Sequence, residues 1–550
     1  MPSDLQRWIL SRDQSCTAKG TRRVKRTGSR PKIVVSADGR GVVGHAGTRL
    51  LTDLAEATGL TGAVSEALLP LRRRASGHDP GRIALDVAVM LADGGEAIAD
   101  LAVLRGQDEL FGPVASASTV WRLLNALDEA ALARLRMARA AAREVAWAQA
   151  AETGRQVASS VAGHPISGLV LDVDATIVIC HSDKELASKT WKRTYGYHPL
   201  LCFLDATGEA LSGLLRTGRA GSNTTADHIK VLDRALAQIP DTHRHGADIL
   251  IRSDSAGATK GFLAHIRCLR EHGVHSFFSI GAAITEAIRT AVTACVDWVD
   301  AIETDGSLRD GAQIAEITHL VDMTGYPDGT RMIVRRERPH PGAQLSLFDT
   351  IAGLRHQVFV TDTPRGGCSL QLLELRHRAH ARVEDRIRTG KDTGLGRFPS
   401  RLFAINQAWL ELALIGIDLL AFTRTLLLNG EHALAEPKKL RYRLLHVAAR
   451  IVHTARRTHL RIAQRWPWGP RPRRRLHPPR RAAQTQFLNP CFRTVYKGYG
   501  EHRLPGRPAT VRTVTPTPAP PSRRSDTPTG RLTESARLVG YVDKTQEVVR

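Results

Sequence analysis

The feature that most constrains the fold of this chain is a nearly continuous apolar run at residues 168–179, in which Asp172 and Asp174 are the only charged side chains. Leu, Val and Ile dominate the run, a composition typical of a strand buried on both faces of a sheet. Side chains alternate between the two faces along a strand, so acids two positions apart share one face. The run therefore predicts a strand that carries two acidic side chains on the same side.

The residues that follow predict the rest of a sheet and its helices. A Gly-containing turn at residues 205–208 separates two apolar runs, which is typical of a hairpin. Helix and strand patterns then alternate, and this order indicates the α/β class, with a mixed sheet flanked by helices. Asp254 ends one of the strands, at the edge where open α/β sheets bind ligands. The predicted strands are 200–204, 210–215, 248–254 and 275–280, and the predicted helices are 226–238 and 258–271.

Helical patterns precede and follow this sheet. Between residues 50 and 155, Ser116 stands before a short amphipathic segment, which predicts a Ser-capped helix at 116–125. Two interpretations of this helix remain open: it is the recognition helix of a helix-turn-helix, or it is an ordinary helix of an all-α domain. A long apolar helix is predicted at 401–428. The charged residues within it, Glu411, Asp418 and Arg424, are costly at bilayer depth, so we interpret it as a buried helix of a soluble protein.

A further helix, predicted at residues 372–388, carries a stripe of ionisable side chains. At 100° per residue, His377, His380, Glu384 and Lys391 project within about 60° of one another. A carboxylate flanked by cationic groups suits a site where divalent ions meet a phosphate backbone. On separate residues, Lys192 and Arg193 beside Trp191 are consistent with DNA binding and base stacking, or with a solvated loop.

The charge of the chain is concentrated at its two ends. Lys and Arg number 78 against 54 Asp and Glu, a net charge of +24 that indicates a polyanionic partner. Residues 1–32 contribute +7 and residues 467–550 contribute +12, which leaves only +5 on residues 33–466. The case for a nucleic-acid partner therefore depends on where side chains are placed in the middle of the chain.

The cysteines and the first residues bear on the compartment. Seven scattered cysteines, none in a CxxC arrangement, predict a reducing compartment and no zinc site. The first thirty residues are polar and basic without an apolar segment behind them, so no secretory signal is expected. We expect a cytoplasmic protein without membrane contact, associated with the nucleoid through DNA.

Taken together, these motifs resemble the DDE transposases of bacterial insertion sequences, the cut-and-paste kind with a ribonuclease H-like core. One subgroup has a β-rich insertion before the glutamate and a helix signature of Tyr, two residues, Arg, three residues, Glu, six residues, Lys. This chain keeps that spacing with His377, His380, Glu384 and Lys391. Arg376, Arg378 and Arg382 are close enough to replace the missing Tyr and Arg. The runs at 181–185, 190–199 and 221–227 are also similar, and the resemblance covers about residues 33–450.

The resemblance implies a site and an activity. Asp174, followed by Ala-Thr, fits the first acid of the triad better than Asp172, which we expect to be structural; Asp254 and Glu384 follow at intervals of 80 and 130 residues. The triad would bind two Mg²⁺ ions, for which Mn²⁺ could substitute. His377, His380, Lys391, Lys192 and Arg193 would bind DNA. The implied reaction cleaves DNA at terminal inverted repeats and joins the ends to target DNA, carried out by a homodimer.

Six parts follow from this reading of the chain. They are a basic disordered leader (1–40), an α-helical N-terminal DNA-binding domain (41–160), the first part of a ribonuclease H-like core (161–281), a β-rich insertion (282–370), the catalytic Glu helix with C-terminal helices (371–466) and a Pro/Arg-rich disordered tail (467–550). The tail suits a DNA-contacting arm or read-through into unrelated sequence. Two other functions remain open: a non-catalytic DNA-binding repressor derived from a transposase, and a nuclease with the same core.

Overall fold

The computed structural model describes residues 33–468, except 37, 75–76, 156, 222, 340–349 and 456. Most of the predicted leader and nearly all of the predicted tail lie outside these described residues. Among the described residues, no helix combines the length and apolarity needed to cross a membrane. Five cysteines fall within the described part of the chain, and all five are unpaired thiols.

A ten-stranded sheet contains the predicted core strands in the order β9-β8-β4-β10-β11. The parallel pairs are β4 with β10 and β10 with β11, whereas β8 runs antiparallel to both β4 and β9. The bounds are Leu169–Ala175 (β4), Leu200–Leu204 (β8), Ala210–Leu214 (β9), Ile249–Ser253 (β10) and Ser276–Ala282 (β11). The run that carries Asp172 and Asp174 is thus a central strand, and the predicted mixed sheet flanked by helices is confirmed.

Helices cover both faces of this sheet. Along β8, Leu201 and Phe203 belong to a core shared with α15 (Phe403–Phe422). The alternate residues Leu200, Cys202 and Leu204 belong to a second core, shared with α9 (Thr225–Leu236) and α11 (Lys260–Cys268). Period-two alternation of large apolar side chains on both faces explains why the strands are nearly continuous apolar runs.

The insertion continues the same sheet. β16 (Leu354–Thr361) pairs antiparallel with β11, and β14 (Arg331–Glu337), β13 (Leu308–Glu316) and β12 (Val299–Ile302) follow in turn. A two-residue strand, β15 (Thr350–Ile351), pairs with β16. The insertion also contains a helix that the sequence pattern did not predict, α12 (Glu286–Ala294). Thr285 caps it by accepting a hydrogen bond from the backbone N–H of Ile288, and its apolar face is buried.

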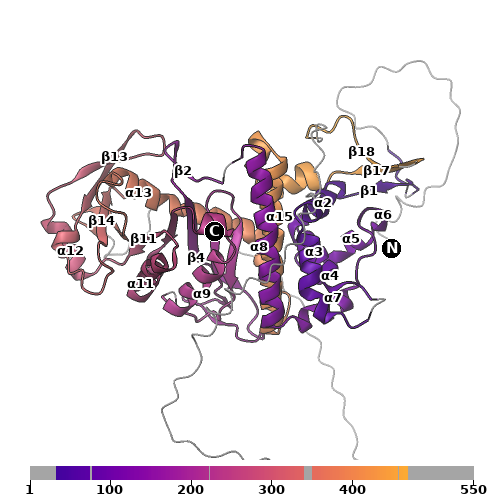
Figure 1. The fold of residues 1–550 in the computed structure, drawn as a ribbon, viewed down its shortest axis with the longest axis horizontal. Helices are drawn as coiled ribbons and strands as arrows, with labels where there is room; N and C mark the ends of the chain where they lie inside the picture. The colour runs from indigo at the N-terminus through magenta and orange to yellow at the C-terminus, as the bar shows by residue number, and fades with distance from the viewer. Residues whose placement is uncertain are drawn as a thin grey trace, which may run out of the picture. The chain divides into compact units, whose positions relative to one another are not determined.

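Helices fill the segment before the sheet. The longest is α8 (Glu129–Glu152), which begins where Asp128 accepts a hydrogen bond from the N–H of Ala131 at 2.7 Å. In Figure 1, α8 and α15 run side by side between the sheet and the preceding helices, consistent with the contacts of α15 with α4, α8 and β9. The preceding helices are α2 (Arg49–Ala57), α3 (Leu60–Leu68), α4 (Pro80–Asp93), α5 (Ala102–Arg105), α6 (Asp108–Phe111) and α7 (Ala117–Ala126).

Two expectations about local structure are wrong. Ser116 stands before α7, but its hydroxyl contacts the side chains of Ser118 and Thr119 and makes no capping bond to the helix backbone. The second concerns residues 449–462, which form a hairpin of β17 (Ala449–Thr454) and β18 (Arg457–Ile462) where helices were expected. β1 (Val42–Val43) pairs with β17, so a partner from the other end of the chain stabilises this strand.

Candidate active site

Asp174 and Asp254 emerge at the same edge of the sheet. β4 and β10 are parallel neighbours in which Val173 is paired with Ser253, so the next residue of each strand is one of these aspartates. Asp254 begins a short 3-10 turn and accepts a hydrogen bond from the N–H of Ala256 at 3.0 Å. Asp174 accepts one from the N–H of Ala175 at 2.7 Å. Strand register therefore brings together two acids that are distant in sequence.

The electrostatics of Asp174 place Glu384 near this pair. The pKa of the Asp174 carboxyl is raised to about 6, first by burial and then by the negative charges of Asp254 and, less strongly, Glu384, against the opposing effect of His380. Glu384 is exposed in the first turn of α14 (Arg382–Gly390), while Val383 and Ile387 hold that helix in the core. The structure thus brings together the three acids that the sequence predicted.

The helix that carries Glu384 is not a single regular helix. α13 (Leu370–Arg378) is followed by a 3-10 turn at Ala379–Ala381, then by α14, and Lys391 begins a π-helical turn, Lys391–Leu395. The helix predicted at 372–388 is therefore interrupted by a 3-10 turn, which changes the angular step locally, and the shared face of His377, His380, Glu384 and Lys391 stays a prediction.

Asp172 occupies a buried ionic network behind the acids. Its two carboxylate oxygens accept hydrogen bonds from Arg252 at 2.7 and 2.8 Å, and His380 Nδ1 lies 2.8 Å from Oδ1. Arg252 also contacts Asp205 at 3.0 Å. Burial opposes ionisation of Asp172, but Arg252 and His380 outweigh it and lower its pKa. Asp172 therefore anchors His380 beside Asp174. The network depends on the pairing of Arg252 with Asp172 across β10 and β4, which local sequence pattern does not reveal.

The other helix cations contact protein groups. The His377 ring stacks on Phe359 with centroids 4.3 Å apart, and its Nδ1 lies 3.1 Å from the Ser279 hydroxyl. Burial, with the positive charges of His380 and Arg252, lowers the pKa of His377 to about 3, so the ring is neutral. The arginines expected as substitutes are also engaged: Arg376 donates to Thr363, Arg378 to Glu303, and Arg382 to Asp205.

Lys391 and Lys192 lie near one another beside the end of β4. Lys391 Nζ donates to the carbonyl of Ile177 at 3.1 Å, and its pKa is lowered by burial and by the positive charge of Lys192. Lys192 Nζ stands 4.9 Å from the ring centre of Trp191, which is 74% exposed. Arg193 is exposed and adopts a left-handed backbone with φ of 63°. The loop 191–193 thus presents two cations and an exposed indole near Lys391.

Two histidines near Asp254 were missed by sequence reasoning. The negative charge of Asp254 acts on both His198 and His228, although burial lowers the pKa of each. His228 Nδ1 lies 2.9 Å from the carbonyl of Thr224, and its buried Nε2 has no hydrogen-bond partner among the described residues. A lone His within an amphipathic helix gives no sequence signal for this position.

The donor set at the sheet edge fits hard divalent cations. Asp174, Asp254 and Glu384 offer only carboxylate oxygens, the ligands that Mg²⁺ and Mn²⁺ prefer. The pKa of Asp174 is raised by burial and, after it, by the negative charges of Asp254 and Glu384, and a bound cation would favour the ionised carboxylate.

The large mixed sheet flanked by helices is consistent with the core of a DDE transposase. The family model of the Transposase DDE domain group 1 matches residues 25–478, and the chain belongs to this family. Among solved structures, the piggyBac transposase synaptic complex with hairpin DNA is similar over 73% of this chain and 79% of that chain, with 9% sequence identity and a TM-score of 0.36. No curated protein matches the chain.

Proposed function

We propose that this protein is an active DNA transposase that cleaves DNA at the inverted repeats of its own element and joins the freed ends to target DNA. The convergence of Asp174, Asp254 and Glu384 at one sheet edge carries the proposal. Membership of the DDE transposase family supports it. We also propose that two copies act together, each cleaving one element end.

The three acids are proposed to hold two Mg²⁺ ions. When bound, such ions activate the attacking oxygen and stabilise the leaving oxygen of a phosphodiester. Asp254 is pre-positioned for this role by its hydrogen bond to the Ala256 N–H, and Asp174 by its place at the end of a central strand. Glu384 makes no hydrogen bond within the described residues that would have to break before binding a cation.

The cations around the acids are proposed to hold the DNA. Lys391 and Lys192 would contact phosphates on either side of the cleaved bond, Arg193 would extend this contact, and Trp191 would stack on an unpaired base. His380, anchored by Asp172, presents a buried Nε2 without a protein partner among the described residues and is proposed to bind a phosphate oxygen. For His377, enclosed by Ser279 and Phe359, we propose a positioning role.

Strand cleavage on a labelled inverted-repeat duplex with Mg²⁺ tests the proposal. We expect wild type to cleave, and Asp254→Asn and Glu384→Gln to lose at least about 100-fold in rate, since each removes a metal-binding charge. Asp385→Asn is the matched control, because Asp385 is an exposed acid next to Glu384 and, among the described residues, pairs only with Arg388. Undiminished cleavage by Asp254→Asn or Glu384→Gln would overturn the assignment. Cleavage without joining would indicate a nuclease.

A further inference from the structure

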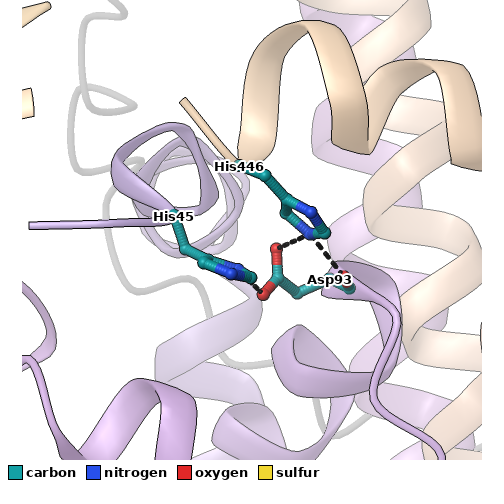
Figure 2. Close-up of side chains that lie close together, drawn as sticks. All are labelled: His45, Asp93 and His446. Carbon is teal, nitrogen blue, oxygen red and sulfur yellow. Dashed lines mark hydrogen bonds and ion pairs between the residues drawn. The ribbon is translucent and has the colours of Figure 1, made fainter. Parts of the chain in front are cut away.

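A second cluster of ionisable side chains lies apart from the carboxylate triad. His45 precedes a short turn after β1, Asp93 is the last residue of α4, and His446 precedes β17. Figure 2 shows both imidazole rings directed at the Asp93 carboxylate. His45 Nδ1 lies 2.6 Å from Oδ2 and His446 Nε2 lies 3.1 Å from Oδ1. One ligand atom from each residue lies within 4.8 Å of the other two, close enough to share a single ion.

Further contacts hold the three side chains in place besides those among themselves. Thr48 donates a hydrogen bond to Asp93 Oδ1 at 2.5 Å, and Asp93 is only 6% exposed. The backbone N–H of Ala46 donates to the carbonyl of Val447 at 2.9 Å, which fixes the two histidine-bearing segments together. Gly47 is required here, because a Cβ at this position would stand 1.7 Å from the carbonyl oxygen of Leu444. Such packing from several sides is what keeps metal ligands in place.

His45 also adopts an unfavourable backbone conformation. Its φ is 49°, in the left-handed region that residues with a Cβ rarely occupy. Strain of this kind persists where surrounding contacts over-determine it and is concentrated at functional sites. The strained backbone directs the ring toward Asp93, whose pKa is lowered to about 2 because hydrogen bonds from His446, His45 and Thr48 outweigh the effect of burial. The carboxylate is therefore ionised.

We propose that His45, Asp93 and His446 bind one Zn²⁺ ion. Two imidazole nitrogens and one carboxylate oxygen are a borderline-soft donor set that zinc accepts, unlike the oxygen-only set of the triad. The two histidine side chains are 31% and 36% exposed, so solvent completes the coordination. The sequence expectation of no zinc site considered only cysteines, and this site uses none.

The ion would fasten both ends of the described chain to one helix. His45 follows β1, His446 precedes β17, and these two strands pair with each other. Arg441, five residues before His446, donates hydrogen bonds to the carbonyls of Ala92 and Asp392. It thus joins the C-terminal end of α4 to the residue that follows Lys391. The site therefore stabilises the segment packed against the end of the glutamate helix.

Zinc stoichiometry of the full-length protein tests this inference. After treatment with a chelator and dialysis, titration with Zn²⁺ alone is expected to show one tight site in wild type. His45→Ala and His446→Ala are expected to weaken it by more than about 100-fold, since even groups that only orient ligands change affinity by 10- to 100-fold. Zn²⁺ should raise the Tm of wild type and leave the Tm of both variants unchanged. His453→Ala, an exposed histidine on β17, is the matched control and should bind like wild type.

Two more variants separate this site from the triad and from misfolding. Asp254→Asn combined with Glu384→Gln should still bind the tight Zn²⁺, so loss of the proposed catalytic function would not affect this readout. His446→Cys should retain binding and, loaded with Co²⁺, add a thiolate-to-cobalt charge-transfer absorption. Equal Zn²⁺ affinity in wild type and His446→Ala, or no tight site in wild type, would overturn the inference and leave an ion-paired cluster only.

Discussion

Asp172 and Asp174 show how two identical side chains on one strand acquire opposite properties. Asp172 is 1% exposed and is bound through both oxygens by Arg252. Asp174 lies at the sheet edge, where burial and two neighbouring carboxylates raise its pKa to about 6. The fold therefore stabilises the ionised form of Asp172, whereas it disfavours the ionised form of Asp174, which a bound cation would stabilise.

Replacing each acid by its amide should therefore separate stability from cleavage. We expect Asp172→Asn to lower the free energy of unfolding by about 3–5 kcal/mol, because it breaks a buried ion pair. Asp174→Asn should leave that free energy unchanged or slightly raise it, while abolishing cleavage. Urea unfolding followed by circular dichroism, with the cleavage assay alongside, measures both. Equal stability of Asp172→Asn and wild type would contradict the anchoring role.

Glu316 gives a pH-dependent test in the insertion. Burial opposes its ionisation, but hydrogen bonds from Arg331, Arg365 and Thr318 lower its pKa from 4.5 to about 2. The folded state thus binds this proton less readily than the unfolded state, so the stabilisation is present above pH 4.5 and is lost as pH falls toward 2. We expect Glu316→Gln to lower the free energy of unfolding by about 1–2 kcal/mol at pH 7. This value is kept small because Arg365 is exposed and solvent screens its charge.

Denaturant unfolding at several pH values checks the Glu316 prediction. The difference in free energy of unfolding between wild type and Glu316→Gln should become smaller as pH falls below about 4.5. Glu286→Gln, whose side chain is 89% exposed, is the control and should show little difference at any pH. A constant difference across the pH range would show that the Glu316 charge is not the stabilising feature.

At the scale of elements, the sequence predicted what depends on local pattern. Period-two and period-3.6 patterns located the core strands, the flanking helices and the position of Asp254 at a strand end, whereas the strand carrying Asp174 was expected to continue to residue 179 and ends at Ala175. They did not predict the pairing of Arg252 with Asp172, because register depends on which strands become neighbours. Nor did they predict the 3-10 and π turns on either side of Glu384. The π turn packs against α15, which follows it, and against α4, which lies far earlier in the sequence.

Gly394 allows the chain to turn after the glutamate helix. Its φ is 91°, and a Cβ would stand 2.9 Å from Leu91 of α4 and 3.2 Å from Ala413 of α15. Its carbonyl accepts a hydrogen bond from the indole N–H of Trp409 at 3.0 Å. We expect Gly394→Ala to cost about 2–4 kcal/mol, from backbone strain together with overpacking, and to slow cleavage by displacing Lys391.

The matched control for this prediction is Gly366→Ala. Gly366 has a φ of 85°, similar to that of Gly394, but no atom lies within 4 Å of the added Cβ. Gly366→Ala should lower the free energy of unfolding by about 1 kcal/mol, since only the backbone conformation is unfavourable there. Thermal unfolding of both variants measures the difference, and equal costs would show that close packing at Gly394 contributes nothing.

At the scale of the whole molecule, buried charge joins the helices before the sheet to the core. The acids that interrupt the predicted apolar helix, Glu411 and Asp418, are 2% and 3% exposed. They pair with Arg136, Arg139 and Arg143 of α8. The sequence showed that these acids were unsuited to a membrane, but it could not show their partners, which lie about 275 residues earlier in the chain.

Arg143 is the centre of this network and the position at which to test it. Its fully buried guanidinium donates to Glu209 at 2.5 Å, to Asp418 at 2.7 Å and to the side chain of Gln238 at 2.7 Å. Since Glu209 adjoins β9, Asp418 lies on α15 and Gln238 follows α9, one side chain links three elements to α8. Arg143→Met removes the arginine that forms the ion pair with Glu209 and one of the two arginines that contact Asp418 Oδ2 among the described residues.

We expect Arg143→Met to lower the free energy of unfolding by about 3–5 kcal/mol, because it leaves buried carboxylates without their partner. It should also split unfolding into two transitions, since α8 and α15 would no longer be coupled to the sheet. Tryptophan fluorescence reports on Trp147, which donates to Glu209 at 3.0 Å, together with the seven other tryptophans, and circular dichroism reports on the secondary structure of the whole chain. The control is Arg134→Met on the same helix, which loses only a bond to the Ala67 carbonyl and should cost about 1 kcal/mol. Coincident transitions and equal costs for the two variants would show that the network does not couple the helices to the core.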